Sequence, residues 1–120
     1  MVHRVQDMFA REGAEATFRA MDDPSNKMFH DRDLYPFVYT PEGVNAAYGA
    51  RPDLVGKNLL NIRDADGKYL IQDIVRITNE QGRGWVDYKW PDPLTNDIEN
   101  KSSYVEKLGD YVVGVGIYLP

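Results

Sequence analysis

Cysteine is absent from this 120-residue sequence, and its absence removes several kinds of chemistry. Disulfide bonds, cysteine-bound zinc and thiol nucleophiles are excluded, while the cellular compartment stays open. Histidine is scarce as well: His3 and His30 lie far apart, and neither has a second plausible metal ligand near it in the sequence. We therefore expect no zinc, no haem and no other cofactor.

Lys and Arg residues are fewer than Asp and Glu residues, and long apolar runs are absent from the sequence. The chain carries 14 Lys and Arg residues against 19 Asp and Glu residues, which gives a net charge of −5. Such a chain has no basic surface to attract nucleic acid, so we expect no nucleic-acid partner. No apolar run approaches the roughly 18 residues that cross a bilayer, and no signal peptide is recognisable. Any membrane link is expected to come from segments absent from this sequence.

The length fits a single domain over residues 1–120. Apolar residues from Val2 to Met21 recur at helical spacing, which predicts one long amphipathic helix within residues 1–24, with Gly13 as its weak point. Pro24 and its turn-forming neighbours end this helix. We expect the helix to cover one face of a sheet formed within residues 33–120.

Two strands are predicted in the first half of that region, at residues 34–40 and 44–48, joined by a turn that ends in Gly43. Pro36 cannot donate to a strand ladder, which favours an early or edge position. A loop follows over residues 49–60. An apolar stripe over residues 68–80 then predicts a helix that ends before Gly82.

Three further strands are predicted at residues 84–93, 101–107 and 111–118, as an antiparallel meander. In the first of them, Val86, Tyr88 and Trp90 share one face and Trp85 lies on the other. Because large groups occur on both faces, something is expected to cover each side of the sheet. Five strands with a helical crossover between the second and third predict an α+β fold. The PAS-like arrangement is a known compact fold that resembles this order of elements.

Acidic residues of the chain suggest a calcium-binding loop or a pair of catalytic acids, and neither kind of site is favoured. With Gly67 placed at the invariant glycine of a calcium loop, Ile62 takes the first ligand position, so the pattern fails. A helix N-cap by Asp64 or Asp66 is the preferred explanation. Other acidic pairs, such as Asp22 with Asp23, occur in turn-forming segments where Asp serves turns and caps. We therefore do not expect an enzyme.

Several segments between about Ala14 and Tyr118 resemble a single Cache domain, of the type called single Cache domain 2, a PAS-like sensor of bacterial chemoreceptors and histidine kinases. The more specific pieces are Trp85-Val86-Asp87-Tyr88-Lys89-Trp90-Pro91 and Lys101-Ser102-Ser103-Tyr104-Val105. The pieces at residues 56–58 and 66–68 are weak by themselves. One departure concerns Ala47-Tyr48-Gly49, where such sequences often read Ala-His-Gly, so a phenol stands in place of an imidazole.

The resemblance implies a long N-terminal helix, about five antiparallel strands, and a pocket between the sheet and the crossover segment. It implies a short carboxylate ligand, such as acetate, propionate, pyruvate or lactate, and a homodimer formed through the N-terminal helix. It also implies an extracytoplasmic, periplasmic location, with a stand-alone cytoplasmic protein as the alternative.

Lys101 is our first candidate for binding an anion, because an ammonium beside phenol hydroxyls suits a carboxylate. The competing interpretation is a solvated lysine on a strand edge. Arg51 and Lys57 are weaker candidates, since cations in loops are usually solvated. Candidate lining residues, each of which could equally be core packing, are Tyr39, Tyr48, Tyr88, Trp90 and Tyr104. Trp85 is assigned to the helix-packed face.

The sequence thus predicts a sensor domain that binds a small molecule in a bacterial chemotaxis or histidine-kinase system. Lys101 and one or more tyrosine hydroxyls would hold a short carboxylate, and closure of the crossover segment would shift the long helix at a dimer contact. The alternative is a stand-alone PAS-like accessory module that associates with a protein and has no small-molecule ligand. A filled pocket and an exposed apolar patch would be its signature.

Overall fold

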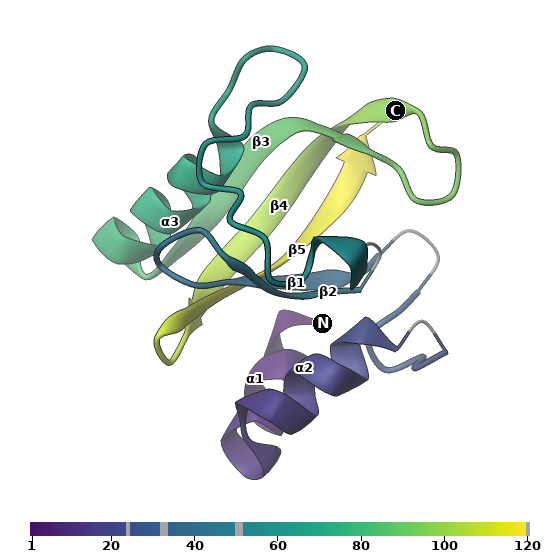
Figure 1. Cartoon of the computed structure of the whole chain (residues 1–120), viewed down its shortest axis with the longest axis vertical. Helices are drawn as coiled ribbons and strands as arrows, with labels where there is room; N and C mark the ends of the chain where they lie inside the picture. Colours follow the sequence, from purple (N-terminus) through teal and green to yellow (C-terminus); the bar gives the residue numbers. More distant parts are fainter. Residues whose placement is uncertain (24, 32–33, 50–51, 120) are drawn as a thin grey trace.

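The computed structural model describes residues 1–23, 25–31, 34–49 and 52–119. Predictions that concern Pro24, Asp33 and Arg51 therefore lie outside the described residues. Within the described residues, three α-helices, one short 3-10 helix and five strands follow one another. Figure 1 shows the sheet at the centre, with α3 packed against one side and the N-terminal helices on the other.

The five strands form one antiparallel sheet with the order β2-β1-β5-β4-β3. Their bounds are Pro36–Tyr39 for β1, Asn45–Tyr48 for β2, Arg83–Pro91 for β3, Ile98–Leu108 for β4 and Tyr111–Leu119 for β5. The meander of the last three strands is confirmed. Pro36 is the first residue of β1, as its missing N–H group favours, and its carbonyl accepts a hydrogen bond from the Gly49 N–H at 3.1 Å.

The crossover between β2 and β3 contains the short 3-10 helix Pro52–Leu54 and α3, Leu70–Gln81. As predicted, α3 ends before Gly82, whose positive φ of 79° suits a glycine and whose N–H donates to the Thr78 carbonyl at 2.9 Å. The predicted N-cap is wrong. Tyr69 occupies the cap position without a side-chain hydrogen bond, and Asp64 binds backbone N–H groups elsewhere.

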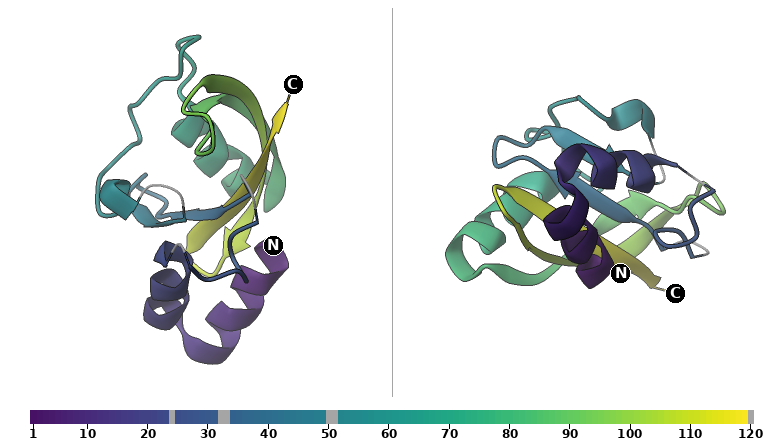
Figure 2. Two further views of the ribbon diagram at one scale, coloured as in Figure 1. Left: turned by 90° about the vertical axis from the view of Figure 1, so that its right-hand side faces the viewer. Right: turned by 90° about the horizontal axis from the view of Figure 1, so that it is seen from below.

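The N-terminal segment is helical as predicted, but it is not one continuous helix. It divides at Gly13 into α1, Val2–Glu12, and α2, Ala14–Asp22. Gly13 adopts a φ of 87°, a left-handed value that reverses the chain and that glycine tolerates. Both views in Figure 2 show the two helices side by side. Within the residues that the structure describes, no helix is long and apolar enough to span a bilayer.

Each face of the sheet packs against its own helices, as the large side chains on both faces predict. Buried residues from α3, from all five strands and from the segment just before β1 form one cluster, which includes Tyr35, Phe37 and Ile74. On the opposite face, α1, α2 and the loop after α2 pack against Val38, Leu108 and Val113. The sheet therefore separates two cores of different composition.

Candidate functional site

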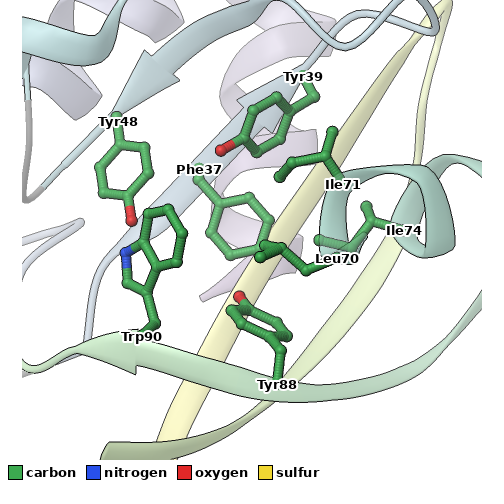
Figure 3. A pocket seen from close by; sticks show the side chains of 8 residues that line it. All are labelled: Phe37, Tyr39, Tyr48, Leu70, Ile71, Ile74, Tyr88 and Trp90. Carbon is green, nitrogen blue, oxygen red and sulfur yellow. The ribbon is translucent and has the colours of Figure 1, made fainter. Parts of the chain in front are cut away.

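Aromatic side chains converge on the space between α3 and the sheet (Figure 3). Four of the predicted lining residues lie there, contributed by three strands: Tyr39, Tyr48, Tyr88 and Trp90. Phe37 from β1 and three aliphatic residues of α3 complete the wall: Leu70, Ile71 and Ile74. In this conformation the side chains close on one another and leave no space for a water molecule. The cavity is thus a packed aromatic core whose occupation requires its walls to separate.

Lys101 lies beside this cavity, on the same face of the sheet. Its side chain projects from β4 between Tyr88 of β3 and Tyr118 of β5, its cross-strand neighbours. Only 1 % of Lys101 is exposed, so the alternative of a solvated lysine is wrong. The ammonium donates a hydrogen bond to the Tyr35 hydroxyl at 2.8 Å and lies 4.3 Å from the centre of the same ring. Three more aromatic rings surround it within 6 Å, those of Phe37, Tyr88 and Tyr118.

Tyr35 is the centre of a buried hydrogen-bond network that the sequence analysis missed. Its hydroxyl lies 2.9 Å from that of Tyr118 and 3.3 Å from that of Tyr48. Because Tyr118 donates its proton to the Pro91 carbonyl at 2.8 Å, Tyr35 donates to Tyr118 and accepts from Lys101. The sequence did contain one signal for this role, because strand alternation places Tyr35 on the same face as Phe37 and Tyr39.

Burial keeps the hydroxyls of this site protonated at neutral pH. It raises the pKa of Tyr35 far above the usual tyrosine value, and the neighbouring Tyr48 and Tyr118 raise it further. The pKa values of Tyr39, Tyr48 and Tyr88 are also raised, in each case mainly by burial. Two of these protonated phenols, Tyr35 and Tyr88, have their ring centres 4.3 and 5.7 Å from the Lys101 ammonium, and phenols beside an ammonium suit an anionic group.

Gly116 creates the room through which Lys101 reaches Tyr35. On β5, Gly116 faces Ser103 of β4, on the same side of the sheet as Lys101. A Cβ atom at this position would collide with the Lys101 side chain and with the Ser103 hydroxyl. The Ser103 hydroxyl is itself hydrogen-bonded to Tyr88 at 2.8 Å. The absence of a side chain at Gly116 therefore positions both polar residues.

The structure does not bring Tyr104 to this site. Successive strand residues point to opposite faces, so Tyr104, three positions after Lys101, faces α1 and packs beside Trp85 at 5.5 Å between ring centres. The sequence alone would have shown that Lys101 and Tyr104, three positions apart on one strand, point to opposite faces. Trp85 lies on the face assigned to it but is 58 % exposed, and Lys57 is exposed in its loop.

A loop at residues 61–69 covers the edge strand β3 next to the site. The Asp64 carboxylate accepts hydrogen bonds from the backbone N–H groups of Asp66, Lys68 and Lys89, at 3.0, 2.9 and 2.9 Å. Although burial opposes ionisation, these donors, that of Lys89 foremost, lower the pKa of Asp64. Between this loop and the sheet lies a recess of about 390 Å³ that reaches Tyr88 and Lys101. The recess is the open side of the site.

Comparison with known proteins identifies the family. The family model of the Cache domain matches residues 20–120. The sensor histidine kinase MctS of Rhizobium johnstonii is 31 % identical over 119 residues, which is 96 % of this chain and 26 % of the kinase. The methyl-accepting chemotaxis protein McpP of Pseudomonas putida is 29 % identical over 92 residues, 75 % of this chain and 17 % of that protein. The chain thus spans about a quarter or less of the length of these relatives.

Solved structures agree with this assignment. The periplasmic sensor domain of a chemotaxis protein superposes with a TM-score of 0.82 at 30 % identity, covering 99 % of this chain and 85 % of that one. A methyl-accepting chemotaxis protein of Vibrio parahaemolyticus gives 0.82 at 26 % identity, over 98 % and 80 % of the two chains. A Cache chemosensory domain studied for carboxylic acid recognition has the same fold, with a TM-score of 0.81 at 21 % identity, over 98 % and 83 %. The chain therefore belongs to the Cache domain family and is a sensor domain of the kind found in chemoreceptors and histidine kinases.

Proposed function

We propose that this sensor domain binds a short carboxylate between α3 and the sheet, with Lys101 as its charge partner. The observation that carries the proposal is the buried ammonium of Lys101, hydrogen-bonded to Tyr35 and enclosed by aromatic rings. Taking a charge out of water is costly, so a buried lysine beside a cavity is a candidate functional residue. The Cache domain studied for carboxylic acid recognition supports the proposal through its shared fold.

Recognition would use both the polar and the apolar parts of the site. A carboxylate would accept hydrogen bonds from the Lys101 ammonium and from a phenol. The candidate phenols are Tyr35 and Tyr48, whose hydroxyls lie 3.3 Å apart. The short carbon chain would lie against Phe37, Tyr88 and Trp90. A wall this close to the charge selects for a small ligand, since a longer chain would displace more of the core.

Binding would be linked to a change of conformation. The aromatic walls are in contact in this structure, so a ligand must move the crossover segment relative to the sheet. A ligand shifts such an equilibrium only by its different affinities for the two states. The recess beside Asp64 would be the route of entry, because it reaches Lys101 from outside. In a longer receptor this movement would pass to an output module.

We extend the proposal to cellular location and to signalling. The extracytoplasmic, periplasmic location that we propose is supported by the resemblance and by the periplasmic sensor domain that shares the fold. The chain would report ligand to the signalling part of a chemoreceptor or histidine kinase, as in the proteins that contain its two relatives. No catalytic step is needed for such a role.

The test is a thermal-shift screen of the purified chain with acetate, propionate, pyruvate and lactate, followed by calorimetry. A ligand at a hundredfold excess over its Kd stabilises the native state by about 2.7 kcal/mol. The variant Lys101→Met should weaken binding by about 10- to 100-fold, the effect of losing one hydrogen bond from a charged group. Lys107→Met is the matched control, because Lys107 lies on the same strand and is exposed.

Two results would contradict the proposal. One is the absence of any shift with the whole panel in a folded sample that carries no co-purified ligand. The other is equal affinity in wild type and Lys101→Met, which would remove Lys101 from recognition.

The alternative function, protein association, has a specific observation in its favour. An apolar recess of about 370 Å³ lies where the start of α1 meets the sheet, lined by residues that include Val2, Trp85, Tyr104 and Ile117. We propose a second copy of this chain as its occupant, in line with the predicted dimer through the N-terminal helix. Sedimentation should then show a dimer that Trp85→Glu weakens. Leu94→Glu, at an exposed apolar residue of the β3–β4 loop, is the control.

A further inference from the structure

His30 occupies a contact that requires a particular protonation state. Its Nδ1 lies 2.9 Å from the Asn26 carbonyl oxygen, and its Nε2 lies 2.9 Å from the Gly49 carbonyl oxygen. Both partners are acceptors only. A neutral imidazole has one N–H group, so it can satisfy one carbonyl while the lone pair of its other nitrogen faces the second. The doubly protonated ring satisfies both.

The contact is closely fitted on both sides. Phe29, the neighbour of His30, is fully buried in the core beneath α1 and α2, which anchors the loop after α2. On the other side, a Cβ atom at Gly49 would come within 3.0 Å of the His30 Nε2 atom. The glycine therefore lets the ring approach the backbone, and a ring rotation that exchanged its partners would have little room.

This contact joins two parts of the molecule that the proposed function needs to couple. Gly49 follows Tyr48 of the aromatic wall, while Asn26 and His30 follow α2. A second bond at the same place is donated by the Tyr48 N–H to the Asp22 carboxylate, at 2.9 Å. The end of β2 is thus tied to the end of α2 by one histidine and one aspartate.

We propose that His30 is a proton-dependent clamp between the loop after α2 and the end of β2, and that it positions the Tyr48 wall of the cavity. Histidine changes charge between pH 5 and 8, so the clamp holds in acid and loosens as pH rises. The part of this inference that concerns ligand rests on the proposed function, and the clamp itself does not.

Charged and titratable groups from every neighbouring element surround the ring. Asp23, at the end of α2, interacts electrostatically with His30. Arg4 of α1 donates to the Met28 carbonyl of the same loop at 3.1 Å and brings a positive charge to that loop. The remaining groups of this kind among the described residues nearby are Asp22, Lys27, Asp31, Tyr35 and Tyr48.

Like the proposed His30 clamp, Asp22 stabilises the fold in its protonated form, so its contribution is also lost as pH rises, but in a lower pH range. Burial raises its pKa above the usual 3.8, partly offset by the Tyr48 N–H. A group with a raised pKa in the folded state stabilises the fold below its usual pKa, and this stability is lost as pH rises through the raised value. The Asp22→Asn variant removes this acid-side contribution and leaves that of His30.

The first test uses the ligand-free chain and reads the protonation of each ring nitrogen by long-range ¹H–¹⁵N spectra from pH 5 to pH 8.5. His3, which is 84 % exposed in its side chain, is the internal reference, and His3→Gln assigns the two rings. We expect both His30 nitrogens to carry protons at the pH where His3 is half neutral. A neutral His30 ring at that pH would overturn the clamp.

The second test compares thermal stability of wild type and His30→Gln, whose amide does not titrate. Between pH 5.5 and pH 8.5 wild type should lose roughly 4 °C more in Tm than the variant, about the effect of 1 kcal/mol in a domain of this size. If the Tm of wild type and that of His30→Gln changed equally with pH, the clamp would be overturned. The His3→Gln profile should follow that of wild type.

The positioning role is tested with pyruvate, which stays ionised across this range. Its affinity for wild type should fall about threefold to tenfold from pH 5.5 to pH 8.5, and its affinity for His30→Gln should change less than twofold. Equal pH dependence in the two proteins would overturn the positioning role. If wild type binds neither pyruvate nor any other carboxylate of the panel, the proposed function fails, and the two ligand-free tests still decide the clamp.

Discussion

The two faces of the sheet are built from the same five strands but bury different chemistry. The face beneath α1 and α2 packs apolar residues such as Val5, Leu108 and Val113. The face beneath α3 buries an ammonium and a set of phenol hydroxyls that are hydrogen-bonded to one another. Apolar packing would stabilise either face at lower cost, because buried polar groups must be desolvated and paired. The polar face is therefore where function is expected, and the apolar face is where stability is expected.

The largest effect should come from the apolar face and should leave binding intact. Leu108 is 4 % exposed at the end of β4, remote from the aromatic cavity. Leu108→Ala should lower the free energy of unfolding by about 2 to 5 kcal/mol through lost burial and a residual cavity. Urea unfolding measures this change, and calorimetry should give an unaltered carboxylate affinity. A large loss of affinity in the folded variant would break the comparison between the faces.

A smaller effect should appear when a methyl group is added to the polar face. Gly116→Ala places a Cβ atom against Lys101 and Ser103, and such overpacking costs typically 1 to 3 kcal/mol. Because the displaced groups belong to the proposed site, affinity should fall together with stability. Val115→Ala, one position away and facing α1, is the control. It should lower stability alone, and a matching fall in affinity there would contradict the assignment of roles.

Much of this arrangement could be predicted from the sequence. Alternation along residues 84–90 predicted which side chains of β3 face the cavity, and the turn residues predicted the meander. The apolar stripe before Gly82 predicted α3 and its end. Such local patterns repeat along an element, so one sequence is enough to recognise them.

Other features depend on contacts that local patterns do not contain. The reversal at Gly13 was missed because the apolar spacing continues on both sides of the glycine, and packing of α2 against β2 decides the direction of the chain. The role of Tyr35 arises from distances to Lys101 and Tyr118, residues 66 and 83 positions later. Tyr104 was misplaced although strand alternation alone excluded it.

A single hydroxyl on each face sharpens the comparison further. Tyr35→Phe removes the group that joins Lys101 to Tyr118 and should cost about 1.5 kcal/mol, because two buried hydrogen bonds of the Tyr35 hydroxyl are lost. The same change at Tyr111, which packs beside Phe18 on the other face, should cost less. Unfolding by urea gives both values. A larger loss at Tyr111 would contradict this comparison between the faces.

The smallest effect should come from the loop that covers only the polar side. Asp64→Asn weakens the bonds from three backbone N–H groups and should cost about 1 kcal/mol at pH 7. The pKa of Asp64 is lowered from its usual 3.8, so its ionised form stabilises the fold above that value, and this stability disappears as pH falls through the lowered pKa. The difference between wild type and Asp64→Asn should therefore be constant from pH 7 to pH 5 and shrink below pH 4. Asp66→Asn, in the same loop with a 65 % exposed side chain, should show a smaller difference. A difference for Asp64→Asn that grows as the solution is acidified would contradict this account, because only an aspartate with a raised pKa behaves in that way.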